Sequence, residues 1–205
     1  QGLKKAQDTE TGKMEHTEEE ETPGGEIVEY AEMGHFTTEI EIYTAYLRLH
    51  PEDVNALYHR AEALRAAGDN KAAQQDFNKI LELNPTDYKA IMNLAGLYFS
   101  GGDYENALNF YERAYQQSPN KARPLVQAGR CAYELDQPDK AIEYYTEAVT
   151  IEQDAPEAYN FRGEAYLAQK DFQRAIDDFK LAIKYRPTFE DARHNLSAAR
   201  REFNA

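Results

Sequence analysis

The sequence predicts an all-α fold, a solenoid in which antiparallel helix hairpins follow one another along one axis. The first observation is a repeat of 34 residues that continues without insertion from starts at Val54, Tyr88, Ala122 and Pro156. A fixed period of this size indicates stacked units that share a continuous core. The second is that apolar residues recur at helical spacing within each half of a unit. The third is that turn-forming residues separate the two halves.

The first half of each unit predicts a helix that carries a column of small residues. An apolar column comprises Leu57, Ile91, Leu125 and Tyr159, and the small column, four residues later, comprises Ala61, Ala95, Gly129 and Gly163. Residues four apart lie on one face of a helix. We expect the small residues to let a second helix approach closely, because a larger side chain would force the two axes apart.

The second half of each unit predicts that second helix. Its alanine column comprises Ala73, Ala107, Ala141 and Ala175, and its aromatic column, four residues later, comprises Phe77, Tyr111, Tyr145 and Phe179. Turns precede this helix at Gly68-Asp69, Gly102-Asp103 and Lys170-Asp171, and prolines follow it at Pro85, Pro119 and Pro187. Proline cannot continue a helix, so it ends the unit. Each unit is therefore a hairpin whose apolar faces only neighbouring units can bury.

The regions that flank the four units are incomplete versions of them. At the C-terminal end the first-helix pattern recurs once more, with Leu196 and Phe203 as its apolar positions. At the N-terminal end Glu39 occupies the alanine column, and an acidic run, Glu18–Glu21, precedes a break at Pro23-Gly24-Gly25. The predicted organisation is an acidic arm (1–25), a degenerate repeat (26–53), four repeats (54–87, 88–121, 122–155 and 156–189) and a capping helix (190–205).

Composition and charge exclude several classes of function. Of 205 residues, 23 are Lys or Arg and 37 are Asp or Glu, and the formal net charge of -14 argues against a nucleic-acid partner. No apolar stretch is long enough to span a membrane. The single Cys131 excludes an internal disulfide. Because the chain opens without Met, we expect export, to a bacterial periplasm or envelope, rather than the alternative cytoplasmic location.

Catalytic motifs are absent from the sequence, so we predict no enzyme, no cofactor and no metal site. The five histidines form no His-Glu-x-x-His pair, and there is no glycine-rich phosphate loop. Cys131 falls inside a predicted first helix and is expected to be a packed thiol. The paired acids Asp177 and Asp178 are expected on the exposed side of a second helix.

The period, the order of the columns and the Gly-Asp turns resemble those of the tetratricopeptide repeat family, over residues 54–189. The resemblance implies a right-handed superhelix of hairpins, with an inner groove lined mostly by the first helices. It also implies a non-enzymatic module that binds a protein or an extended peptide in that groove. One alternative is an assembly subunit that acts through its convex face or ends, and a further alternative is a co-chaperone.

The resemblance also implies which side chains face the groove. The candidate site residues are Tyr58, Arg65, Lys89, Met92, Asn93, Phe99, Arg123, Val126, Arg130 and Tyr133. They include a basic centre and an apolar lining, although repeat proteins also scatter charges on exposed helix faces. The family's carboxylate clamp, which grips the acidic C-terminus of heat-shock chaperones, is incomplete. Asn93 and Arg123 fit it, but Tyr58, Glu62 and Gln127 replace its other members.

The expected ligand is an extended peptide with acidic and apolar side chains, held across the second and third units. A related expectation concerns the acidic arm. Residues 8–32 hold ten acids and one base, Lys13. Because the groove centre is basic, we expect this arm to fold toward it. The sequence indicates no oligomeric state.

Overall fold

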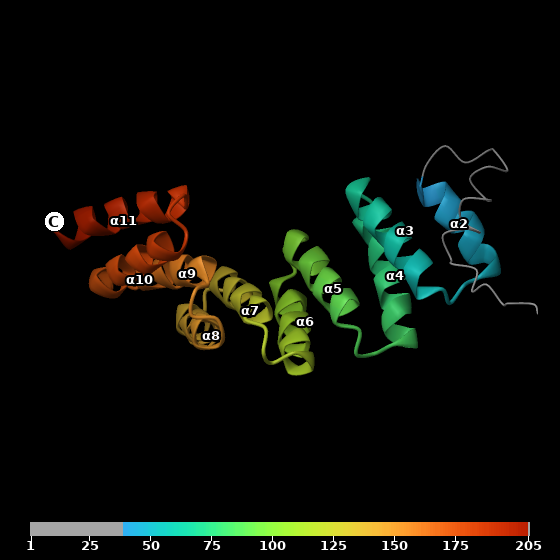
Figure 1. Ribbon diagram of the computed structural model, residues 1–205, viewed down its shortest axis with the longest axis horizontal. Helices are drawn as coiled ribbons and strands as arrows, with labels where there is room; N and C mark the ends of the chain where they lie inside the picture. Colours follow the sequence, from blue (N-terminus) through green and yellow to red (C-terminus); the bar gives the residue numbers. More distant parts are fainter. Residues whose placement is uncertain (1–38, 205) are drawn as a thin grey trace, which may run out of the picture.

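The structure is a computed structural model that describes residues 39–204, and over that range it is an elongated stack of helices (Figure 1). The helices of the described range are α2 (Glu39–Leu49), α3 (Val54–Ala66), α4 (Asn70–Leu83), α5 (Tyr88–Ser100), α6 (Tyr104–Gln117), α7 (Arg123–Glu134), α8 (Pro138–Ile151), α9 (Pro156–Ala168), α10 (Phe172–Tyr185) and α11 (Glu190–Phe203). No strand occurs among these residues. The predicted all-α solenoid is confirmed.

Each helix packs against the helix before it and the helix after it, from α2 at one end to α11 at the other (Figure 1). Helix α9 also contacts α7 and α11, which occupy the same place in the neighbouring units. The helices α3, α5, α7 and α9 therefore follow one another along one side of the stack, which we call the groove face. The cavities described below lie on this side.

Local sequence explains where the helices begin. The side chains of the residues before α3, α4, α5, α6 and α10 accept a hydrogen bond from the backbone N–H three residues later; they are Asp53, Asp69, Asp87, Asp103 and Asp171. Such caps satisfy backbone donors that the first helical turn leaves free. Helices α7, α8 and α9 instead have proline in the first turn, where its missing N–H costs no helical hydrogen bond.

The turn between the two helices of a hairpin needs a left-handed backbone. Gly68 and Gly102 adopt φ of 86° and 79° in the first two hairpins. Asp136 and Lys170 occupy the same place in the next two, with φ of 57° and 62°. Glycine adopts this conformation without steric cost, whereas other residues are strained in it. The turn geometry is therefore kept even where the sequence does not provide glycine.

The core consists of small residues facing aromatic rings, as the columns predict. The four alanines of the second-helix column are fully buried, as are Phe77 and Phe179. A Cβ atom placed on Gly129 would lie 2.5 Å from the ring of Tyr145, and one on Gly163 would lie 2.7 Å from the ring of Phe179. These rings therefore occupy the space that any side chain on the glycine would need.

A buried ion pair corrects one expectation. Asp177 is exposed as predicted, but the prediction for Asp178 was wrong, because its residue is only 5% exposed. The Arg162 guanidinium donates to both carboxylate oxygens of Asp178, from Nε at 2.7 Å and from Nη2 at 2.8 Å. Its Nη1 also donates to Thr146 Oγ1 at 3.2 Å. This arrangement joins helices α8, α9 and α10, and it satisfies a charge that would otherwise be costly to bury.

The same arrangement occurs 102 residues earlier, which is three repeats. Arg60 donates to Asp76 from Nε at 2.8 Å and from Nη2 at 2.6 Å, and from Nη1 to Thr44 Oγ1 at 3.5 Å. In the two intervening units the Arg and Asp places hold Leu94 with Phe110 and Ala128 with Tyr144. The first and fourth units are therefore tied by ion pairs at a place where the second and third have uncharged side chains.

The acidic arm (1–25) and the first part of the degenerate repeat (26–38) lie outside the described residues. Helix α2 belongs to the second part of that repeat. The buried residues on its apolar side are Tyr43, Tyr46 and Leu47. None of the helices in residues 39–204 combines the length and the apolar character that crossing a membrane requires.

Candidate functional site

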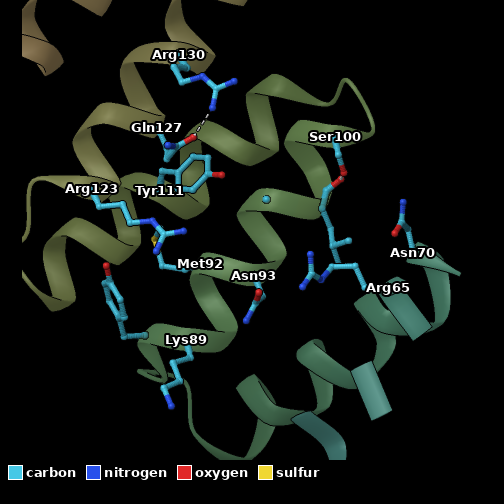
Figure 2. A pocket seen from close by; sticks show the side chains of 13 residues that line it. Arg65, Asn70, Lys89, Met92, Asn93, Ser100, Tyr111, Arg123, Gln127 and Arg130 are labelled. Atoms are coloured by element: carbon cyan, nitrogen blue, oxygen red, sulfur yellow. Dashed lines mark hydrogen bonds between the residues drawn. The ribbon is translucent and has the colours of Figure 1, made fainter. Parts of the chain in front are cut away.

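A cavity of about 740 Å³ opens on the groove face between α3, α5 and α7. We call it the cationic cavity. Its described lining comprises Arg65, Asn70, Tyr88, Lys89, Met92, Asn93, Gly96, Leu97, Ser100, Tyr111, Arg123, Gln127 and Arg130. Figure 2 shows Arg65 on one side of the cavity, Arg123 and Arg130 on the other, and Lys89 and Asn93 between them on α5. Helix α5 therefore provides the floor, and its neighbours provide charged walls.

The charge of this cavity is opposite to that of the chain. Four of its described lining residues are Lys or Arg, and none is Asp or Glu, although the chain carries a formal charge of -14. Arg65, Lys89, Arg123 and Arg130 form no ion pair with any carboxylate of residues 39–204. Because like charges repel, placing these four cations around one cavity opposes stability, and an anion among them would reduce that cost.

Tyrosine hydroxyl groups add neutral donors to the cationic cavity. Burial is the main cause that raises the pKa of Tyr111 to about 12, while Arg130 and Arg123 act in the opposite direction. Burial also raises the pKa of Tyr88, against the effect of Arg123. Both hydroxyl groups therefore stay protonated at neutral pH and can donate a hydrogen bond to an anion.

Arg130 is the most constrained of the four cations. Its guanidinium lies 4.6 Å from the ring centroid of Phe99 on α5 and 5.2 Å from that of Phe161 on α9. Its Nη1 donates to Gln127 Oε1 at 3.0 Å (Figure 2). Contact between a guanidinium and an aromatic ring is attractive. The two rings and the amide thus hold the Arg130 guanidinium between three helices without neutralising it.

A second cavity, of about 450 Å³, lies on the other side of α7. We call it the apolar cavity, because Val126, Ala155, Ala158 and Phe161 are prominent in its lining. It shares Arg123, Gln127 and Arg130 with the cationic cavity, and we call these three residues the α7 ridge. Two carboxylates also line it, Glu152 and Glu157. Glu157 pairs with Arg186.

The structure brings together six of the ten predicted site residues in the cationic cavity: Arg65, Lys89, Met92, Asn93, Arg123 and Arg130. Val126 lines the apolar cavity, and Phe99 contacts Arg130 from outside both cavities. Tyr58 lines neither, because its hydroxyl donates to Asp87 at the start of α5 and its ring meets Phe77 edge-on. Tyr133 lines neither and is 39% exposed.

Sequence reasoning missed several lining residues. Gln127 entered only as a departure from the carboxylate clamp, and Tyr111 only as a core residue. Tyr111 is 4% exposed and lines the cationic cavity from α6, so one residue serves both roles. Tyr88 lies at a place of the repeat that was not assigned to the groove. Phe161 lies two repeats after Asn93, at the same place of its unit, so the period itself was the signal that could have found it.

Further along the groove face, a polar network joins α9 to α11. Asn160 donates to Glu164 Oε1 at 2.7 Å, and Asn195 donates to the same oxygen at 2.8 Å. Burial raises the pKa of Glu164, and the two amide donors oppose that effect. The carboxylate is therefore engaged within the fold rather than presented to a ligand.

Cys131 is a free cysteine, and its side chain is buried. Burial raises the pKa of the Cys131 thiol to about 12, so it stays protonated at neutral pH and is a poor nucleophile. Within residues 39–204 no three His, Cys, Asp or Glu side chains lie together as metal ligands would. The chemistry available on the groove face is hydrogen bonding, charge and apolar contact.

Comparison with family models gives a consistent result along most of the stack. Three models, each described as tetratricopeptide repeat, match residues 64–105, 88–154 and 126–188. Together they extend over residues 64–188. The comparison with curated proteins found no match.

Several solved structures are similar to this one. MamA from Desulfovibrio magneticus RS-1 has a TM-score of 0.67 at 22% identity, over 73% of this chain and 85% of that chain. YrrB, described as a TPR protein with an unusual peptide-binding site, has a TM-score of 0.62 at 21% identity, over 77% and 81%. The first TPR of Spaghetti (RPAP3), bound to the HSP90 peptide SRMEEVD, has a TM-score of 0.56 at 19% identity, over 58% and 94%. These similarities show a shared fold.

Proposed function

Since this chain belongs to the tetratricopeptide repeat family, we propose that it is a non-enzymatic interaction module whose groove face binds an extended protein segment. The family and its fold generally serve protein–protein interaction. The segment carries acidic and apolar side chains, and it lies mainly across the second and third units.

The observation that carries this proposal is the set of unpaired cations in the cationic cavity. Arg65, Lys89, Arg123 and Arg130 come from three helices and converge on one cavity without a carboxylate partner among the described residues. Charges scattered on exposed faces would not be expected to converge in this way in an acidic chain. An acidic ligand supplies the missing partners, and charges of this kind steer and orient a ligand more than they add affinity.

The apolar part of the ligand follows from the neighbouring surface. Met92 lies in the cationic cavity, and Val126 and Phe161 line the apolar cavity beside it. Buried apolar and aromatic contacts commonly provide most of the affinity in peptide recognition. The peptide bound to the Spaghetti repeat, SRMEEVD, also combines acidic with apolar side chains.

A chaperone-type carboxylate clamp is a weaker alternative. Asn93 and Arg123, the two residues that fit the clamp pattern, both line the cationic cavity. However, the hydroxyl of Tyr58, which replaces a clamp lysine, is directed to Asp87 rather than to the cavity. An internal acidic segment therefore fits this site better than a chain terminus held by its carboxylate.

The test uses a fluorescein-labelled peptide with two adjacent glutamates and one phenylalanine in a background of glycine and serine. Arg123→Glu with Arg130→Glu should weaken its binding to the full chain at least tenfold, or about 1.4 kcal/mol, as fluorescence anisotropy measures. Binding to the parent should also weaken as salt rises, because exposed charges are screened beyond about 8–10 Å. Circular dichroism should show unchanged helicity.

The matched control is Lys79→Glu with Lys180→Glu. These lysines lie on second helices, α4 and α10, where Lys180 is exposed and Lys79 is half-exposed. Among the described residues their ion-pair partners are Glu82 and Asp177 of the same helix. The control changes the net charge by the same amount but leaves the groove face intact. Equal affinity of the two double variants, or binding without salt dependence, would contradict the proposal.

A further inference from the structure

We infer that the α7 ridge divides the groove face into two subsites that recognise a ligand by the spacing of its side chains. An acidic side chain occupies the cationic cavity, and a single apolar side chain about three residues away occupies the apolar cavity. Arg130 is the specificity-determining residue, since it lines both cavities and its guanidinium is held against the rings of Phe99 and Phe161. This inference rests on the proposed function and specifies its ligand.

The first step of the argument is that the two cavities adjoin. Arg123, Gln127 and Arg130 line both of them, and these residues lie three or four apart on one face of α7. A ligand that crosses the ridge therefore meets both cavities in succession, with the same three side chains on either side of it.

The second step is that the cavities prefer different side chains. The described lining of the cationic cavity has four cations and no carboxylate. In the apolar cavity Glu152 and Glu157 balance the charges of Arg123 and Arg130, so an acidic side chain is attracted less strongly there than in the cationic cavity. Specificity depends on such a difference between two affinities. A ligand is therefore favoured in one arrangement of its acidic and apolar residues.

The third step concerns Arg130. The rings of Phe99 and Phe161 and the amide of Gln127 fix the direction of its guanidinium. Within the described residues, the Gln127 contact is the one hydrogen bond that this group makes. Its remaining N–H groups are free to donate to a carboxylate on the cationic side. On the side of the apolar cavity, the hydrocarbon part of Arg130 and the rings around it contact the apolar side chain of the ligand.

The last step is the spacing. Neighbouring packed helices are separated by about 8–10 Å, so a shift from one side of α7 to the other covers about that distance. A segment in the extended polyproline II conformation advances about 3.1 Å per residue and brings a side chain back to the same face every three residues. The acidic and apolar side chains of the ligand should therefore be about three residues apart.

The experiment compares three labelled peptides of one composition on the full chain. Each has two adjacent glutamates and one phenylalanine among glycines and serines. The phenylalanine follows the second glutamate directly, after two serines, or after seven residues. The middle peptide should bind at least fivefold more tightly than the other two. Equal affinity for all three would overturn the inference.

Substitutions test which residues of this chain bind the acidic and the apolar side chains of the peptide. Phe161→Ala should remove the preference for phenylalanine over alanine in the peptide but leave the salt dependence of binding. If this variant loses helicity, Phe161→Leu provides the same comparison.

Arg130→Lys keeps the charge but not the planar group and should weaken binding more than Arg65→Lys does, because Arg65 has no aromatic partner among the described residues. Equal losses from the two lysine variants would also overturn the inference.

Failure of the inference can be told from failure of the proposed function. If every spacing binds equally and Arg123→Glu with Arg130→Glu abolishes all binding, the groove binds acidic segments and only the inference is wrong. If no peptide binds to the parent chain at any salt concentration, both the inference and the proposed function are wrong.

Discussion

At the scale of single residues, two glycines in successive first helices have opposite surroundings. A Cβ atom on Gly129 would lie 2.5 Å from the buried ring of Tyr145, whereas one on Gly96 would lie 3.9 Å from its nearest neighbour, the Tyr111 hydroxyl. Gly129→Ala should destabilise the chain by about 1–3 kcal/mol, as overpacking does. Gly96→Ala should stabilise it by about 0.5–1 kcal/mol, because alanine favours a helix.

Thermal unfolding followed by circular dichroism measures both changes. Each kcal/mol corresponds to about 2–4 °C for a chain of this size. The two variants serve as controls for each other, since each adds one methyl group to a glycine of a first helix. Shifts of the same sign would show that the ring of Tyr145 does not determine the choice of glycine at residue 129.

A second prediction at this scale concerns pH. Burial raises the pKa of Glu164, so the folded chain holds that proton more tightly than the unfolded chain does. The stabilisation is therefore complete below the ordinary glutamate pKa of about 4.3 and is lost as pH rises through the raised value. Glu164→Gln keeps an oxygen that Asn160 and Asn195 can donate to. It should raise the melting temperature at pH 7 but not at pH 4, and the same shift at both pH values would argue against burial as the cause.

At the scale of helices, the buried ion pair occurs in the first and fourth units, and uncharged residues take its place in the second and third. Removing one partner, as in Asp178→Ala, should cost about 3–5 kcal/mol, because it leaves the Arg162 charge buried without a partner. Replacing both with the residues of the second unit, Arg162→Leu with Asp178→Phe, should recover most of that loss. Urea unfolding of the parent, the single variant and the double variant measures the difference.

The chain itself provides the model for the double variant. Leu94 and Phe110 occupy these places in the second unit, which follows the unit that holds the ion pair Arg60–Asp76. A double variant no more stable than Asp178→Ala would mean that the interfaces of the second and fourth units are not equivalent.

The helices were predictable because the side chains that pack against a neighbouring helix recur about once per helical turn in the sequence. The spacing of Ala107 and Tyr111, repeated in every unit, is enough to place a hairpin. The site was less predictable, since it depends on which partner a side chain takes. Tyr58 and Met92 occupy the same place of the repeat, but Tyr58 is held by Asp87 and only Met92 lines the cationic cavity. Asp178 was misjudged because its burial depends on Arg162, 16 residues earlier, and a helix pattern does not contain that pairing.

At the scale of the whole molecule, the uneven distribution of charge suggests competition within the chain. Residues 8–32 hold ten acids and one base, and the cationic cavity holds four cations that form no ion pair with a carboxylate of residues 39–204. A tethered segment acts at a high effective concentration even when each exposed pair contributes only about 0–1 kcal/mol. Neutralising the acidic run with Glu18→Gln, Glu19→Gln, Glu20→Gln and Glu21→Gln should therefore increase the affinity of the full chain for the labelled peptide severalfold.

The control removes the same amount of charge from exposed sites on the helical body, with Glu52→Gln, Glu105→Gln, Glu134→Gln and Glu143→Gln. It should change the affinity little, because these residues are not part of the arm. If both sets increase the affinity equally, the effect is one of overall charge, and the arm does not compete for the cavity.

The unpaired cations also have a consequence for folding. Four like charges that converge on one cavity without a carboxylate partner among residues 39–204 are a region of local frustration, where the sequence gives up stability that a different choice of residues would retain. Neutral substitution of one of them, such as Arg65→Gln, should make the empty chain more stable and the bound chain less so. Under the proposed function, the cationic cavity is the part of this solenoid where selection for the fold and selection for a ligand oppose each other.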